Sequence, residues 1–290
     1  MAFFKCIACP FECNDVSICG KFLVPRVKLS TKKIEELGFY HVYPGNYVLF
    51  VETFGCNLGC KDCLYPHIFA KGLFEIRESI EGDVVILSCN SGKNYELLDK
   101  IKVRKALGLI THGFLNQEIL KKYVEKTDFF MIVFFGFSKG SYAHLTISRS
   151  ALKYAKEATK FLVKNDKFLE IRYVVVEHVN DRKDELKAFF EWVLNLDDSI
   201  PVHIKRFYSP ESNRAPTRNE KLFLAYKIAK EIGLRYVYID DLFKHEAKNT
   251  YYGGKLVIER IGDETKIISP ELLEKIPIYG EIRNYGGIIA

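Results

Sequence analysis

The chain has 290 residues, of which 48% are hydrophobic and 28% charged, and its 43 basic and 37 acidic side chains give a net charge of +6. It can bury the core of one large α/β domain with small appendages, and without a basic block interleaved with aromatics it does not indicate nucleic-acid binding. No window approaches the roughly 18 apolar residues of a membrane span, and the first residues do not resemble a secretory leader. We therefore expect a cytoplasmic protein whose thiols are reduced.

Four cysteines lie within the first 20 residues in the spacing C-x2-C-x3-C-x5-C. Four thiolates so close in sequence suit either a tetrahedral zinc ion or an auxiliary iron-sulfur cluster, and the sequence leaves both open. A segment this short cannot form a hydrophobic core large enough to fold, so it needs a cross-link such as a bound metal. We predict a metal-binding segment over residues 1–30, with Cys6, Cys9, Cys13 and Cys19 as its ligands.

From there on, β-branched apolar runs alternate with amphipathic stretches of helical period, which predicts βα units around a parallel sheet. Six or seven units make a partial (β/α)6 TIM-type barrel, which we assign to residues 31–245. The clearest helices are 151–163 and 220–232, and Gly233 is placed as the C-cap of the second. The predicted strands are residues 47–52, 84–88, 106–111, 129–135, 169–177, 202–207 and 234–239.

The first predicted strand leads into Cys56, Cys60 and Cys63, spaced C-x3-C-x2-C. Soft thiolates at short spacing select iron-sulfur or zinc, and a structural zinc site normally has four ligands. Three thiolates leave one iron of a cubane 4Fe-4S cluster without a protein ligand, so the spacing favours a cluster with an open, reactive iron. A zinc site completed from elsewhere, for example by His67, and three buried small side chains are the alternatives.

In barrels of this type the loops after the strands build the active site. The cysteine loop therefore lies on the face where chemistry is expected, together with the other strand ends. Among these are Arg172 on the fifth predicted strand and His203 on the sixth. Each has a structural alternative, because Arg172 can bridge neighbouring carboxylates and His203 can be a core histidine.

The cysteine motif resembles the signature of radical S-adenosylmethionine (SAM) enzymes. Segments 171–181, 201–207 and 234–239 resemble the pyruvate formate-lyase activating enzyme branch, most closely the AmmeMemoRadiSam-system radical SAM enzyme, in order from about Cys6 onward. The resemblance implies an oxidoreductase-type enzyme in which SAM chelates the open iron and is cleaved to a 5'-deoxyadenosyl radical. That radical abstracts hydrogen from an unidentified substrate, for which a glycyl-radical-type partner protein is one candidate. It also implies a reductant such as ferredoxin or flavodoxin.

The same resemblance assigns residues to SAM. Arg172 would pair with the SAM carboxylate, a bidentate task that suits a planar guanidinium, and His203 would contact the ribose or adenine. Asn90 and Ser91 stand where the family carries a Gly-Gly-Glu or Thr-Glu-Pro motif for the SAM ammonium. These two residues could accept a hydrogen bond, although a neutral acceptor is weaker than a charged one.

Other positions depart from the family pattern. Asp62 replaces a usual aromatic residue, and Phe134-Phe135-Gly136 replaces Asp-Leu-Lys, with Lys139 as a nearby substitute. These losses keep open a second hypothesis, a degenerate member that holds iron-sulfur or zinc for electron transfer or scaffolding without SAM turnover.

The C-terminal residues 246–290 lack the C-x2-C pair of the family's metal ribbon, so we expect a small β appendage there. The eighth cysteine, Cys89, is either a buried small residue or a thiol facing the reaction chamber.

Overall fold

The computed structural model describes residues 8–11, 26–69, 79–89, 92–262, 264–284 and 287–289. At its centre is an eight-stranded sheet whose strands lie side by side in chain order. The first strand runs antiparallel to the second, and the other pairs are parallel. The strands are β1 (Val27–Lys33), β2 (Tyr47–Thr53), β3 (Ile80–Cys89), β4 (Ile101–Thr111), β5 (Phe129–Phe134), β6 (Phe168–Val175), β7 (Val202–Arg206) and β8 (Val237–Ile239).

The predicted α/β sheet is confirmed, and it is wider than expected. The seven predicted strands correspond to β2–β8, while β1 is an additional antiparallel edge strand. In the part of the chain that the structure describes, no ladder joins β1 to β8, so these two strands are the edges of the sheet. The predicted boundary between residues 30 and 31 falls inside β1, so residues on both sides of it belong to one strand.

The helical crossovers are concentrated in the second half of the sheet. Every connection from β4 to β8 contains at least one α-helix, and Gly233 caps the last one at φ +107° as predicted. Before β4, the described residues of the crossovers form only the 3-10 turns η2 (Pro66–Phe69) and η3 (Gly92–Leu97). The α-helices are α1 (Gln117–Lys126), α2 (Lys139–Leu145), α3 (Ala151–Lys164), α4 (Lys183–Leu194) and α5 (Asn219–Ile232).

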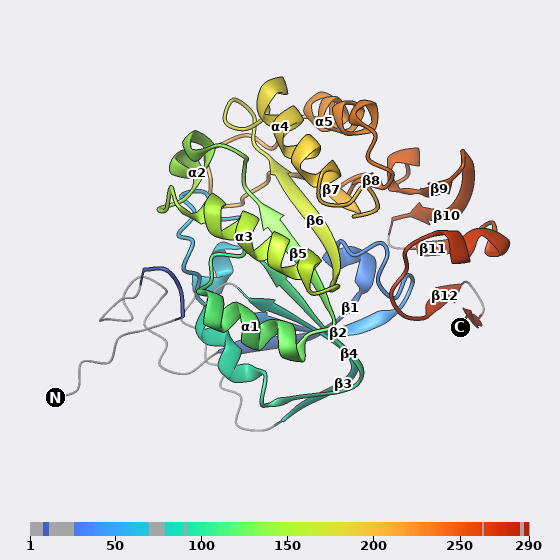
Figure 1. Cartoon of the computed structure of the whole chain (residues 1–290), viewed down its shortest axis with the longest axis horizontal. Helices are drawn as coiled ribbons and strands as arrows, with labels where there is room; N and C mark the ends of the chain where they lie inside the picture. Colours follow the sequence, from blue (N-terminus) through green and yellow to red (C-terminus); the bar gives the residue numbers. More distant parts are fainter. Residues whose placement is uncertain are drawn as a thin grey trace.

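Strand β5 shows why the sheet is covered on both faces. Its six residues are all apolar, and successive side chains point to opposite faces. Phe130, Ile132 and Phe134 belong to the core shared with the helices, which lie along one face of the sheet in Figure 1. Phe129 and Met131 belong to a separate core on the other face.

That second core is completed by the chain between β1 and β2, which begins with η1 (Ile34–Leu37). Ile34 and Phe39 are fully buried there, and the Phe39 ring meets Phe129 edge-on at 5.3 Å. Because Phe129 is the first residue of β5, this segment covers the face of the sheet opposite the helices at the amino ends of the strands. The same face is left uncovered at the carboxyl ends, where a cavity lies.

The C-terminal region carries the predicted small β structure, drawn in red at the right-hand side of Figure 1. Strands β9 (Thr250–Tyr252), β10 (Lys255–Ile261) and β11 (Glu264–Ile267) form an antiparallel sheet, and β12 (Ile282–Asn284) pairs with β13 (Gly287–Ile289). The 3-10 turn η4 (Glu246–Lys248) precedes β9, and the 3-10 turn η5 (Pro270–Lys275) lies between β11 and β12.

This region packs on the main sheet through an apolar core that contains Ile258 and Tyr238. The buried Arg260 adds a polar link, because it donates to the carbonyl of Tyr40 at 2.6 Å. Within the described residues, no helix has the length and apolar character needed to cross a bilayer.

Candidate functional site

A cavity of about 540 Å³ lies at the carboxyl ends of the parallel strands. This is the edge of an α/β sheet at which binding sites are expected. Each parallel strand contributes a residue near its end, or just after it, to the wall: Glu52 (β2), Ser88 (β3), Thr111 (β4), Val133 (β5), Arg172 (β6), Lys205 (β7) and Asp240 (after β8).

The three cysteines of the C-x3-C-x2-C motif all line this cavity. Backbone N–H groups of Leu58 and Tyr65 lie 3.4 Å from the sulfurs of Cys56 and Cys63, respectively, where they favour the thiolate form. Burial raises the pKa of the Cys60 thiol, and the other two cysteines raise it further because three negative charges would be crowded together. A cationic metal centre removes that penalty and deprotonates its thiol ligands. The donor set therefore fits a metal cluster.

Zinc and iron-sulfur differ in the geometry they require. In the residues that the structure describes, no group of three or more His, Cys, Asp or Glu side chains could hold one metal ion. A cubane cluster instead takes each thiolate on a different iron. His67, the suggested fourth zinc ligand, places Nε2 2.7 Å from Oε1 of Glu52, whereas His112 places Nε2 3.8 Å from the Cys56 sulfur.

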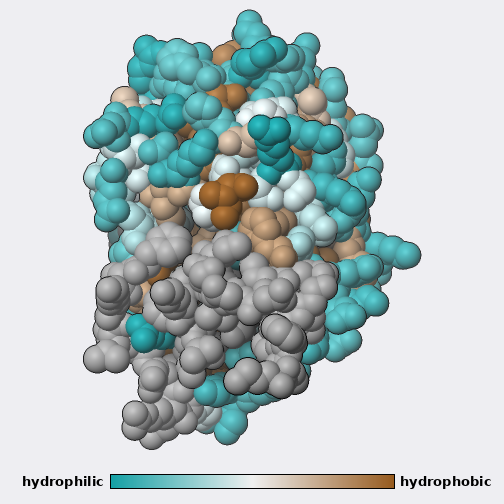
Figure 2. All heavy atoms as spheres, turned by 90° about the vertical axis from the view of Figure 1, so that its left-hand side faces the viewer, coloured by the Kyte–Doolittle hydropathy of each residue, from teal (hydrophilic) through white to brown (hydrophobic). Residues whose placement is uncertain are grey.

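The cysteine loop rests on the chain that follows α2. Gly59 has φ +58°, and a β-carbon there would lie 2.7 Å from Cδ1 of Ile147. The Ile147 N–H also donates to the carbonyl of Leu58 at 3.3 Å. Ile147 is about half exposed. The side of the molecule that carries α2 is largely hydrophilic, with a few hydrophobic side chains near its centre (Figure 2).

Several predicted site residues lie outside the described part of the chain. Of the N-terminal cysteines only Cys9 is described, and it is buried with a free thiol. The second metal site and the contacts to the SAM ammonium therefore stay predictions. The residues not described are Cys6, Cys13, Cys19, Asn90 and Ser91.

Arg172 lies in the cavity wall, held by the protein itself. Its Nε donates to Oδ2 of Asp240 at 3.0 Å, and Nη2 donates to the carbonyl of Leu37 at 2.7 Å. Gly38, at φ +78°, is required here, because a β-carbon would lie 1.5 Å from Nη2 of Arg172. Arg172 thus pairs with a neighbouring carboxylate, as a purely structural arginine would, and it also lines the cavity.

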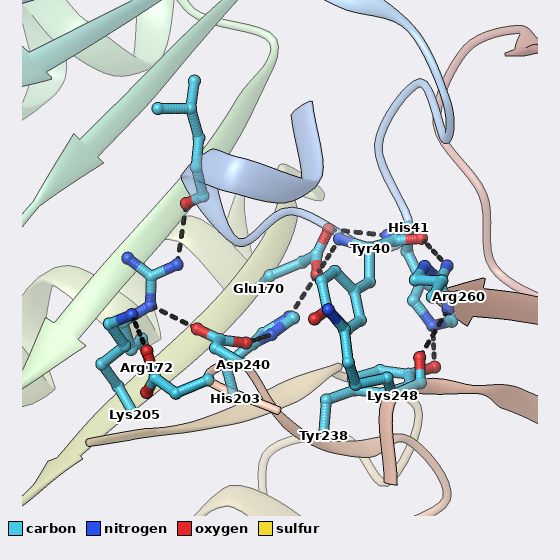
Figure 3. Close-up of polar contacts among 12 residues, drawn as sticks. Tyr40, His41, Glu170, Arg172, His203, Lys205, Tyr238, Asp240, Lys248 and Arg260 are labelled. Carbon is cyan, nitrogen blue, oxygen red and sulfur yellow. Dashed lines mark hydrogen bonds and ion pairs between the residues drawn. The ribbon is translucent and has the colours of Figure 1, made fainter. Parts of the chain in front are cut away.

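His203 is fully buried between two carboxylates (Figure 3). Its Nε2 lies 2.6 Å from Glu170 and its Nδ1 lies 2.7 Å from Asp240. Burial alone would lower the pKa of His203, but the two carboxylates outweigh it and raise that pKa. His203 is not among the residues that line the cavity, so its predicted contact with SAM gains no support from this geometry. Its role in the structure is to hold Asp240, which in turn holds Arg172.

Sequence reasoning missed the carboxylates of this array. Besides His203, Glu170 accepts the backbone N–H groups of Tyr40 and His41 at 3.1 and 3.0 Å. Burial raises its pKa, but the charge and hydrogen bond of His203 outweigh burial and lower it. One signal was available, since Glu170 and Arg172 are the charged residues of an otherwise uncharged strand and share one face of it.

Asp62, a departure from the family pattern, and Lys139, the suggested substitute for the Asp-Leu-Lys motif, are not among the residues that line the cavity. The hydroxyl of Ser212, in the loop after β7, donates a hydrogen bond to Asp62 at 2.6 Å. Oδ2 of Asp62 also lies 3.6 Å from Nε of Arg214. Lys139 is the first residue of α2. The wall at the end of β5 is instead apolar, formed by Val133 and Phe135.

Comparisons with known proteins give distant likenesses. No family model matches the chain. An uncharacterized protein of Methanocaldococcus jannaschii, MJ0808, is 27% identical over 271 residues, which is 85% of this chain and 80% of the relative.

Among solved structures, a domain of a pyruvate-formate lyase-activating enzyme from Bacteroides vulgatus matches at 11% identity and a TM-score of 0.37, over 47% of this chain and 81% of that one. Streptococcus suis SuiB matches at 10% identity and a TM-score of 0.45, over 68% and 47% of the two chains. SuiB bound to S-adenosylmethionine matches at 9% identity and a TM-score of 0.46, over 68% and 48%. Likenesses this weak carry no argument about the activity of this chain.

Proposed function

We propose that this chain is a radical SAM enzyme of the pyruvate formate-lyase activating type, with a 4Fe-4S cluster on Cys56, Cys60 and Cys63. One observation carries the proposal: three cysteine thiols, spaced to leave one iron open, line a single cavity at the carboxyl ends of a parallel sheet. When bound, the cluster and SAM supply a 5'-deoxyadenosyl radical that abstracts hydrogen from a substrate.

The residues of the chain bind and orient SAM in this proposal. Arg172, fixed by Asp240 and by the Leu37 carbonyl, presents its guanidinium to the SAM carboxylate. The bonds to Asp240 and Leu37 engage two of its five N–H groups. Val133 and Phe135 exclude water from the end of β5. A reductant such as ferredoxin or flavodoxin supplies the electron, and a glycyl-radical-type protein is one candidate substrate.

A second candidate function is favoured by the same contacts. Arg172 already pairs with Asp240, and both ring nitrogens of His203 contact carboxylates. A chain whose expected SAM ligands are used internally could hold iron-sulfur or zinc for electron transfer or scaffolding without cleaving SAM. This is the degenerate alternative.

Electron paramagnetic resonance separates the two functions. The protein is reconstituted anaerobically with iron and sulfide, reduced, and measured with and without SAM, with Cys60→Ala as the control. The proposed enzyme is expected to change its spectrum when SAM is added, because SAM ligates the open iron. An unchanged spectrum in a cluster-loaded protein supports the degenerate alternative. A colourless protein that retains zinc and takes up no iron contradicts the proposed enzyme and leaves the zinc form of the degenerate alternative.

A further inference from the structure

One wall of the cavity is built by segments outside the parallel strands. Glu35 comes from η1, and Lys248 ends η4 at the start of the C-terminal region. Both line the cavity and both are more than nine-tenths buried, at 7% and 5% exposure. Neither has a role in holding the cluster or SAM in the function proposed above.

Glu35 has one carboxylate oxygen in use and one that is not. Its Oε1 accepts from the N–H of Gly45 at 2.6 Å and from the hydroxyl of Thr265. Its Oε2 is buried and, within the described residues, has no hydrogen-bond partner. An unpartnered buried charge is costly, and burial accordingly raises the pKa of Glu35. Burial therefore shifts Glu35 toward its protonated form.

Lys248 differs from the other two cations of the cavity. Arg172 pairs with Asp240 and Lys205 with Asp241. Among the described residues no carboxylate pairs with Lys248, whose Nζ donates instead to the carbonyl of Gly262. Lys248 lies beside the buried polar network in Figure 3.

The surroundings of Lys248 favour its neutral amine. Burial lowers its pKa and the guanidinium of Arg260 lowers it further, against opposing contributions from Asp240, Glu35 and Asp241. A lysine desolvated near another cation is an activated nucleophile. Neighbouring groups whose pKa values are pushed in opposite directions are the usual mark of an acid–base pair.

We propose that Lys248 captures a small aldehyde or ketone as an imine, with Glu35 as the acid that assists it. The Nζ lone pair adds to the carbonyl carbon, and the carbonyl oxygen takes a proton from Glu35. Nζ then gives a proton to the Glu35 carboxylate, and Glu35 passes it to the hydroxyl, which leaves as water as the C=N bond forms. The iminium nitrogen returns its remaining proton to Glu35, which gives the imine. Amine plus carbonyl gives imine plus water, so no oxidant or reductant is needed.

The walls near this pair suit an uncharged carbonyl compound. Leu37, Leu242 and Phe243 provide apolar surface in the same cavity. The nearby charges of Arg172 and Lys205 are already paired, so an anionic group gains less from them. The inference rests on the proposed function where it takes the captured carbonyl compound to be the substrate of the radical reaction. Formation of the imine itself requires neither the cluster nor SAM.

The test is reductive trapping on the full chain. The protein is incubated with butanal and cyanoborohydride at about pH 7, where a lysine of ordinary pKa is almost fully protonated, and the added butyl groups are mapped by peptide mass spectrometry. Lys248 is expected to be labelled several-fold faster than the exposed Lys121 and Lys153. Labelling of Lys248 at or below the rate of those two lysines, in a natively folded sample, overturns the proposal.

Variants assign the roles. Glu35→Gln is expected to slow labelling of Lys248 several-fold and to leave Lys153 unchanged, whereas Glu36→Gln, on the neighbouring cavity residue, is expected to have no effect. Lys248→Arg keeps a long basic side chain but removes the amine, and it loses the label. If Glu35→Gln labels Lys248 at the wild-type rate while circular dichroism shows a native fold, the acid role of Glu35 is wrong.

The outcome is independent of the radical chemistry. A protein that labels at Lys248 but forms no 5'-deoxyadenosine contradicts only the proposed function. A protein that cleaves SAM but leaves Lys248 unlabelled contradicts only this inference.

Discussion

At the scale of single residues, four of the buried ionisable side chains form one connected array. Glu170, His203, Asp240 and Arg172 alternate in sign and contact one another in that order. Buried charges of this kind add little net stability as a set, but removing one partner leaves another uncompensated. The array therefore fixes the position of Arg172 in the cavity wall.

Asp240→Asn tests this dependence. The substitution keeps the shape but removes the charge shared by His203 and Arg172, so we expect a loss of about 3–5 kcal/mol in the free energy of unfolding. Urea denaturation measures it, with the exposed pair Arg182–Asp184 as the control, where Asp184→Asn should have a much smaller effect because water screens an exposed pair. Equal effects at the two sites would show that the array is not coupled.

Two buried histidines predict opposite pH dependences. The raised pKa of His203 means that its stabilisation is complete below about pH 6.5, the ordinary histidine value, and is lost as pH rises through its folded pKa. Burial lowers the pKa of His41 to about 4, so its contribution is present above about pH 6.5 and is lost as pH falls toward that value.

The measurement is the free energy of unfolding across a pH series. His203→Gln is expected to remove the alkaline decline, and His41→Gln the decline on the acid side, whatever the total stability of each variant. Slopes identical to wild type in either variant would contradict the assignment.

At the scale of elements, strands were predictable where both faces are buried. The six apolar residues of β5 identify a strand without knowledge of its neighbours. β1 was missed because it is a polar edge strand, with one buried residue among seven. The first two crossovers were expected to be helical, yet their described residues form 3-10 turns.

The cysteine loop offers a prediction at this scale. Gly59→Ala places a β-carbon against Ile147 in a left-handed conformation, and it is expected to lower the iron content after reconstitution at least several-fold. Gly233→Ala also alters a glycine of positive φ, but nothing lies within 4 Å of the added carbon, so iron content should stay unchanged. Iron and sulfide analysis of both variants decides, and equal loading would show that the loop does not depend on Gly59.

At the scale of the whole molecule, the cavity depends on contacts that no local pattern predicts. Sequence spacing identified the three cysteines and placed Arg172 near the mouth. It could not show that Glu35 and Lys248 share a wall, because that requires η1 and the C-terminal region to meet. The link between Arg260 and Tyr40, 220 residues apart in sequence, is likewise visible only in the folded chain.

The central claim is that Cys56, Cys60 and Cys63 hold a cluster that cleaves SAM, and product analysis tests it most directly. Anaerobically reconstituted, reduced protein is incubated with SAM, and 5'-deoxyadenosine is quantified by chromatography beside a Cys60→Ala control. We expect 5'-deoxyadenosine from the wild-type protein well above the control. A cluster-loaded protein that binds SAM and yields no more than Cys60→Ala would contradict the claim.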